Sequence, residues 1–154
     1  MAGMRFTLDF HGDTQIDRTL LRMSMDVADA RPAWEVLAGK FARAERKQFS
    51  SEGGYASGGW APLSPKYAAW KQRHFPGKPI LERTGALKES LTQRPFGVEV
   101  LEPEFMVVGS GIDYGAYHQQ GTSRMPQRRP VELTEADRRA WVNVIQRFIV
   151  TGSV

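Results

Sequence analysis

The 154-residue sequence contains no cysteine and no long apolar run, and these two absences exclude several classes of protein. Without cysteine there is no disulfide framework, no thiolate metal site and no cysteine nucleophile, as expected of a chain folded in a reducing cytosol. No uncharged apolar stretch approaches the roughly eighteen residues that a membrane span requires. No apolar segment of the secretory-signal type follows Met1. We therefore expect neither a membrane partner nor export.

Residues of the types that bind metals or catalyse reactions are few and scattered. His11, His74 and His118 lie far apart in the sequence, and none has a partner of metal-ligand type one helical turn away. There is no Gly-x-Ser-x-Gly elbow for a serine nucleophile, and the Gly109-Ser-Gly111 run lacks the glycine pattern of a phosphate loop. We predict a non-enzymatic protein with no catalytic, cofactor or metal site. A small hydrolase that joins His118 to a carboxylate is a remote alternative.

Composition and charge are those of a single soluble globular domain spanning residues 1–154. Hydrophobic residues make up 41% and charged residues 25% of the chain, and the formal net charge is +4. The basic residues are scattered, whereas a nucleic-acid binder usually concentrates them on one element. A solvated, mildly basic surface is therefore the simpler interpretation, and charge by itself does not identify a partner.

Apolar periodicity predicts an α+β fold, with a small, mostly antiparallel sheet packed against amphipathic helices. Residues 5–10 alternate polar and apolar, which indicates an opening strand. Residues 96–101 and 104–109 are apolar-rich runs joined by a Glu-Pro turn, which is typical of a hairpin. Helices are predicted over residues 15–30, 32–50, 65–73, 84–91, 112–119 and 135–150. Thr134 and Asp137 form a capping box at the start of the last helix.

Two irregular segments separate these elements. The first, at about residues 50–62, is rich in glycine and serine and is predicted to be a long flexible loop, and the second covers about residues 121–130. The first loop carries Tyr55 and Trp60. Such a loop is either an interaction arm that becomes ordered on a partner, or a segment that folds Trp60 back onto its own core. Both interpretations remain open from the sequence.

The loops and short helices display large aromatic residues and arginines, which is the composition of a protein–protein interface. So many aromatics in the peripheral segments of a small domain must either fill the core or contact a neighbour. The candidate interface residues are Tyr55, Trp60, Tyr67, Tyr114, Tyr117, His118, Arg128 and Arg129.

Three blocks of sequence resemble the phage virion morphogenesis (tail completion) family of Mu-like and related tailed phages and prophages. The blocks are Trp60-Ala-Pro-Leu-Ser-Pro-Lys-Tyr67, Ile80-Leu-Glu-Arg-Thr-Gly-Ala-Leu87, and Tyr114-Gly-Ala-Tyr-His-Gln-Gln-Gly121 followed by Arg128-Arg-Pro-Val-Glu-Leu-Thr134. The resemblance extends from the second predicted helix to the last. It implies a structural protein of the head–tail connection, located in the virion and assembled in the cytoplasm of the bacterial host. The resemblance also implies a homo-oligomeric ring of six or twelve subunits on the tail tube or in the neck. Its neighbours would be the tail tube, the tail terminator and the head connector, and no cofactor is implied.

A ring built from identical chains needs two different surfaces that meet each other. We hypothesise that the first loop with Trp60 is one surface and that residues 114–129 are the other. In the Ile80–Leu87 block, we expect Thr84 to cap a helix, Gly85 to allow close packing and Leu87 to be buried. We expect Arg83 to pair with an acidic neighbour, either within the chain or across subunits.

Contact with exiting DNA is the alternative role for such a ring. Arg124, Arg128 and Arg129 would then line the DNA path. A channel through which DNA must slide gains little from strong phosphate binding, because each phosphate contact adds affinity through counterion release. We therefore expect any DNA contact to be weak.

Overall fold

The computed structural model describes residues 14–154, so the strand predicted at residues 5–10 lies outside the described residues. The described elements agree with the predicted helices and hairpin to within about two residues at each end, and they confirm the α+β class. In chain order they are α1 Thr14–Ala28, α2 Arg31–Ser50, α3 Pro65–His74, α4 Ala86–Thr92, β1 Val98–Leu101, β2 Met106–Gly109, α5 Asp113–Gln120 and α6 Glu135–Thr151.

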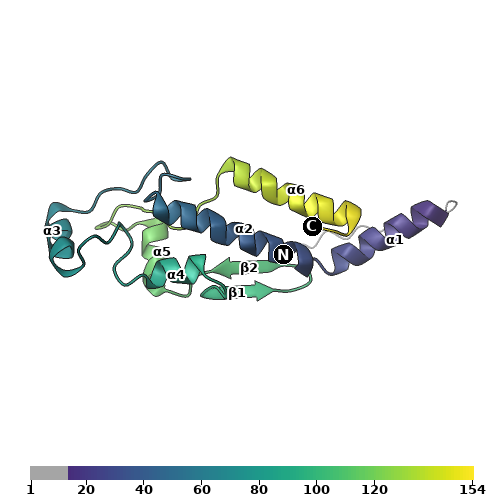
Figure 1. Ribbon diagram of the computed structural model, residues 1–154, viewed down its shortest axis with the longest axis horizontal. Helices are drawn as coiled ribbons and strands as arrows, with labels where there is room; N and C mark the ends of the chain where they lie inside the picture. Colours follow the sequence, from purple (N-terminus) through teal and green to yellow (C-terminus); the bar gives the residue numbers. More distant parts are fainter. Residues whose placement is uncertain (1–13) are drawn as a thin grey trace.

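Helix α2 is the central element of the fold. Figure 1 shows it running along the long axis of the molecule, between α6 on one side and the hairpin with α4 on the other. Small side chains on α2, among them Ala38 and Ala42, are fully or almost fully buried and let the neighbouring elements approach closely. Larger apolar residues fill the space around them: Phe41, Phe49, Trp60, Leu87, Leu91 and Phe96. Burial of these side chains is the main contribution to stability.

Helices α1 and α6 are held together at the far end of the molecule. Helix α1 projects beyond the rest of the chain (Figure 1). Its Arg22 guanidinium donates to the carbonyl oxygen of Val150, near the end of α6, at 2.9 Å. Leu21 and Met25, one helical turn apart on α1, are 63% and 66% exposed. The described part of α1 therefore has one face against α6 and another that nothing in residues 14–154 covers.

The hairpin has one buried face and one exposed apolar face. Its register pairs Leu101 with Met106 and Val100 with Val107. Met106 packs against the core, whereas Val100 and Val107 are 36% and 46% exposed. Because side chains alternate between the two faces of a strand, the outward valines form a continuous apolar strip beside the core-facing residues.

Two helix starts follow the local sequence as predicted. The Ser64 hydroxyl accepts from the backbone N–H of Tyr67 at 3.4 Å, and Pro65 occupies the first turn of α3. At α6, Thr134 Oγ1 accepts from the Asp137 N–H at 3.0 Å, while the Asp137 carboxylate accepts from the Thr134 N–H at 3.1 Å. The capping box predicted from the sequence is confirmed.

The start of α4 corrects the roles expected of Thr84 and Gly85. Gly85, and not Thr84, occupies the N-cap position, with a left-handed φ of 93°, and no side chain caps the helix. The Thr84 hydroxyl makes only a 3.4 Å contact with the Ala86 N–H. A Cβ atom at Gly85 would meet the flexible end of the Glu89 side chain. Glycine is therefore required here for its backbone conformation and not for close packing. Leu87 is 1% exposed, as expected.

We expect the Gly85→Ala substitution to destabilise the fold by about 1–2 kcal/mol, because an L-residue is strained at this φ. The Thr84→Ala substitution serves as the matched control and is expected to cost less than about 0.5 kcal/mol, since no cap hydrogen bond is lost. Urea unfolding of the two variants checks this order. A larger effect at Thr84 than at Gly85 would contradict it.

Candidate functional site

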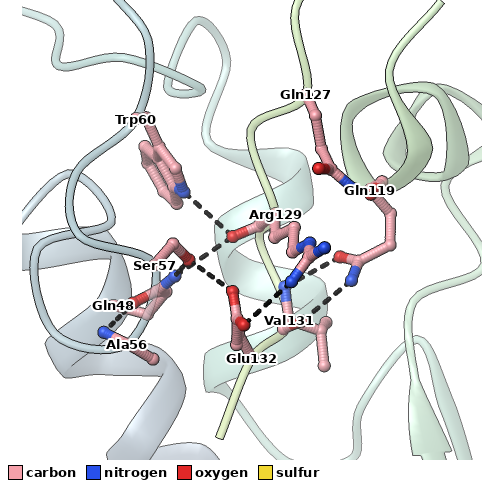
Figure 2. Close-up of polar contacts among 9 residues, drawn as sticks. All are labelled: Gln48, Ala56, Ser57, Trp60, Gln119, Gln127, Arg129, Val131 and Glu132. Atoms are coloured by element: carbon pink, nitrogen blue, oxygen red, sulfur yellow. Dashed lines mark hydrogen bonds and ion pairs between the residues drawn. The ribbon is translucent and has the colours of Figure 1, made fainter. Parts of the chain in front are cut away.

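The two loops predicted as separate surfaces are joined to each other in the folded chain. Figure 2 shows the side-chain amide of Gln48, at the end of α2, between them. Gln48 Oε1 accepts from the Ala56 N–H at 3.0 Å, and its Nε2 donates to the carbonyl oxygen of Arg129 at 3.1 Å. The Ser57 hydroxyl donates to the Glu132 carboxylate at 2.8 Å. Gln48 is fully buried, so these bonds are shielded from water.

Trp60 belongs to this junction and to the core. Its indole N–H donates to the carbonyl oxygen of Arg129 at 2.9 Å, and its ring meets Phe49 edge-on at a centroid distance of 5.3 Å. Only 7% of Trp60 is exposed. Of the two interpretations left open by the sequence, the one that folds Trp60 onto its own core is found. In this fold the indole is not an exposed docking side chain.

Arg128 makes the second connection between the loops. Its guanidinium donates to the carbonyl oxygens of Ala61 and Pro62 at 2.6 and 2.8 Å, and the residue is 5% exposed. The two loops, hypothesised as two ring surfaces, are therefore joined as one unit within a single chain. A buried Arg128 is also not positioned to line a DNA path. Arg129 is exposed and pairs with Glu132 at 3.0 Å.

Tyr55 is tied to the last helix. Its hydroxyl lies 2.9 Å from both carboxylate oxygens of Asp137, the residue that completes the α6 capping box. The Lys47 ammonium lies 5.0 Å from the centre of the Tyr55 ring. These contacts hold the Tyr55 side chain half-buried against its own chain, so a subunit contact would reach only its remaining exposed part.

The three sequence blocks surround one groove of about 530 Å³. Tyr67 of α3 and Tyr114 of α5 stand at its rim and are 41% and 42% exposed. Tyr67 stacks on Trp70, and Tyr114 meets His118 edge-on. The remaining lining comes from all three blocks and the second loop: Leu63, Ser64, Lys71, Leu81, Glu82, Arg83, His118, Arg124, Met125, Pro126 and Arg128. Tyr117, 60% exposed, faces a second hollow between α4 and α5 and does not line this groove.

The buried cations of the groove, Lys71 and Arg128, donate their hydrogen bonds to backbone carbonyl oxygens. The Lys71 ammonium, 5% exposed, donates to the carbonyl oxygen of Pro79; burial lowers its pKa, against the opposing effect of the Glu52 and Glu82 charges. Arg128 is bonded only to backbone carbonyls, and burial lowers the pKa of its guanidinium too. Arg128 has no carboxylate partner among the described residues, and its buried charge gives the groove a positive potential that favours an anionic group.

His118 also lines the groove, as a neutral side chain. Its Nδ1 atom is buried and has no hydrogen-bond partner among the described residues. Burial, and then the neighbouring Arg128, lower the pKa of the imidazole, so His118 is neutral at pH 7. Nothing in the groove pairs this ring with a carboxylate. His74 lies elsewhere, with Nδ1 2.8 Å from the Trp70 carbonyl oxygen, and His11 lies outside the described residues.

Arg83 has no carboxylate within ion-pairing distance among residues 14–154; its guanidinium lies 6.0 Å from the centre of the Phe75 ring. The neighbouring Glu82 pairs instead with Lys88 at 2.9 Å. Arg83 and Arg124 are both exposed beside the groove. In the part of the chain described, no group of three or more potential metal ligands occurs, and no helix is long and apolar enough to cross a membrane.

The sequence that contains these blocks matches the model of a known protein family. The model of the phage virion morphogenesis family matches residues 12–149. The chain belongs to this family. It is a structural morphogenesis family of tailed phages and not a family of enzymes, so the resemblance seen in the sequence is confirmed. Comparisons with curated proteins and with solved structures gave no significant match.

For this phage morphogenesis protein, sequence reasoning missed the residues that join its loops. Gln48 occupies the position at which the apolar stripe of α2, formed by Leu37, Phe41 and Ala44, would continue. A polar residue at such a buried position is the sequence signal that could have identified Gln48. Glu45 lies on the same helix and is also fully buried. The burial of Arg128 had no local signal, because its partners are more than sixty residues away in the chain.

Proposed function

We propose that this protein is a tail completion or neck subunit that forms a homo-oligomeric ring at the head–tail junction of the virion. The groove carries this proposal. Three sequence blocks build it, its rim presents Tyr67 and Tyr114 to solvent, and four of its lining residues are cationic against one carboxylate. Exposed tyrosines beside an apolar groove are typical of protein–protein contacts.

The ring would contact proteins on both of its sides. On this proposal the partners are other copies of the chain, the tail tube or tail terminator, and the head connector. Assembly takes place in the host cytoplasm before the ring joins the virion. Six or twelve copies are the expected subunit numbers.

The arrangement of the arginines favours protein contact over a DNA-lining role. Arg128 is buried, and Arg129 is paired with Glu132. Of the three arginines expected at a DNA path, this leaves Arg124 as the exposed one without an ion pair among the described residues. A mobility-shift assay with duplex DNA at 50 and 200 mM salt tests the alternative. We expect no discrete complex at either salt concentration.

The ring itself is tested by native mass spectrometry and negative-stain electron microscopy of the purified chain. We expect closed rings of one subunit number. The Tyr114→Ala substitution should weaken assembly by about tenfold or more, because tyrosine is enriched among the few residues that dominate the binding energy of protein contacts. The matched control is Val142→Ala, at a 50% exposed position on α6 away from the groove. A chain that is monomeric at every concentration would contradict the proposal.

A further inference from the structure

The turn of the hairpin is an exposed acidic segment bonded to the start of α2, where Arg31 interacts electrostatically with Glu102. We call residues 102–105 the hairpin tip. The carboxylates of Glu102 and Glu104 are exposed there, and Phe105 is 51% exposed. Three hydrogen bonds to backbone carbonyl oxygens fix the tip. The Glu102 N–H donates to the Phe105 oxygen at 2.9 Å, and the Ala30 N–H donates to the Pro103 oxygen at 2.9 Å. The Trp34 indole N–H donates to the Glu102 oxygen at 3.0 Å. A fixed backbone loses little entropy when the tip is bound.

The groove has the opposite charge and a matching apolar lining. Four of its lining residues are cationic (Lys71, Arg83, Arg124 and Arg128), and its one carboxylate, Glu82, is already paired with Lys88. Tyr67 and Tyr114 stand at the rim. The groove therefore suits a segment that carries both carboxylates and an aromatic ring. Among residues 14–154, the hairpin tip combines these features on exposed side chains.

The tip and the groove of one chain lie at opposite ends of α2. The tip is bonded to Trp34 in the first turn, whereas the groove is attached, through Arg128 and the Trp60 loop, to the end that carries Gln48. Figure 1 shows the hairpin turn near the start of α2, and α3 beyond the opposite end of α2. A helix of 20 residues spans about 30 Å. A tip can therefore reach only the groove of another copy.

We propose that the hairpin tip of one copy docks into the groove of the next, with Glu102 and Glu104 facing Arg83 and Arg124 and with Phe105 entering between Tyr67 and Tyr114. This inference rests on the proposed ring function and identifies the contact that would build the ring. The contact joins two different surfaces, as a closed ring of identical subunits requires. The outward valines of the hairpin continue the apolar surface from the tip and extend the contact.

The test is an exchange of charges between the two surfaces. A tip variant carries Glu102→Lys and Glu104→Lys, and a groove variant carries Arg83→Glu and Arg124→Glu. Each variant opposes like charges at every contact with its own copies, so we expect assembly of each to weaken by about a hundredfold. All four positions are exposed, and circular dichroism and thermal melting should show folded chains.

Assembly should return when the charges are complementary again. In an equimolar mixture, the lysine tip meets the glutamate groove and the native tip meets the native groove, so we expect rings that alternate the two variants. A chain that carries all four substitutions should assemble by itself. Native mass spectrometry distinguishes these species by mass, and raising the salt concentration should weaken wild-type assembly.

The control variant is Arg138→Glu, an exposed position on α6 that does not line the groove, and it should assemble as the wild type does. If the wild type forms rings and both charge variants also form them, the tip-in-groove contact is wrong while the ring function stands. Loss of assembly in both variants without recovery in the mixture also overturns this contact. A monomeric wild type overturns the contact and the ring together.

Discussion

Replacing Glu45 by glutamine is expected to stabilise the protein at neutral and alkaline pH, by an amount of the order of 5 kcal/mol at pH 8. Glu45 lies on α2, is fully buried, and neither carboxylate oxygen has a hydrogen-bond partner among the described residues. Burial, and then the negative charge of Asp137, raise the pKa of Glu45 to about 9. The folded chain therefore holds this carboxyl in its neutral form at pH 7, whereas the unfolded chain ionises it.

The sign of the pH dependence follows from this difference. The ordinary pKa of a glutamate side chain is 4.5, and that of Glu45 in the folded chain is about 9. Between these two pH values, the folded state binds a proton on Glu45 that the unfolded state has lost. The contribution of Glu45 to the free energy of unfolding therefore falls as the pH rises through this window, with a limiting slope of about 1.4 kcal/mol per pH unit. Glutamine has no proton to lose, so this decrease should be absent from the variant.

Urea unfolding of the wild type and Glu45→Gln at pH 5, 6.5 and 8 measures the effect. The two curves should lie close together at pH 5 and separate steadily toward pH 8. The exposed Glu89 on α4 provides the control, and Glu89→Gln should leave the pH dependence unchanged. If Glu45→Gln shows the same pH dependence as the wild type, the buried carboxyl is not held neutral by the fold.

The Trp60→Ala substitution is expected to destabilise the fold by about 3–5 kcal/mol, which is the range for removing a large aromatic residue from a core. The change removes the edge-on contact with Phe49 and the hydrogen bond to the Arg129 carbonyl oxygen. Gly53 lies against the same ring, since a Cβ atom there would be 2.4 Å from the indole Cδ1. The cavity left by alanine therefore adjoins a glycine that cannot fill it.

Two matched variants distinguish the loss of core packing from the loss of an exposed aromatic side chain. Trp60→Phe keeps most of the apolar contact and loses the indole N–H, so it should cost about 1 kcal/mol through the hydrogen bond and a smaller cavity contribution. Trp70→Ala removes a tryptophan that is 39% exposed on α3 and should cost about 1 kcal/mol or less. Thermal unfolding monitored by circular dichroism checks this order. Equal losses at Trp60 and Trp70 would contradict the core position of Trp60.

The groove and the junction beneath it explain why the three family blocks belong together. The Trp60–Tyr67 block supplies a core tryptophan, the carbonyl oxygens that hold Arg128, and the rim residue Tyr67. The block that contains Tyr114 supplies the opposite rim. In each block, some residues are buried and hold the groove in its shape. Others remain exposed at the groove, where a partner can contact them.

Local features of the fold were predictable because they depend on residues close together in the chain. The capping box of Thr134 and Asp137, the Pro65 helix start and the Glu102-Pro103 turn each involve four or fewer consecutive positions. The start of α4 was the exception. Gly85 adopts a left-handed conformation that sequence alone did not separate from a threonine cap.

The sequence by itself determined the helices, the hairpin and the family to which the chain belongs. Only the tertiary structure decided which loop residues are exposed. The sequence places Trp60 and Arg128 with Tyr67 and Tyr114 among the interface candidates, yet the first pair is buried and the second lines the groove rim. The difference arises from partners such as Arg129 for Trp60 and Ala61 for Arg128, which are more than sixty residues away. Whether such a side chain packs or projects depends on contacts that close long loops, and no local pattern in the chain carries that information.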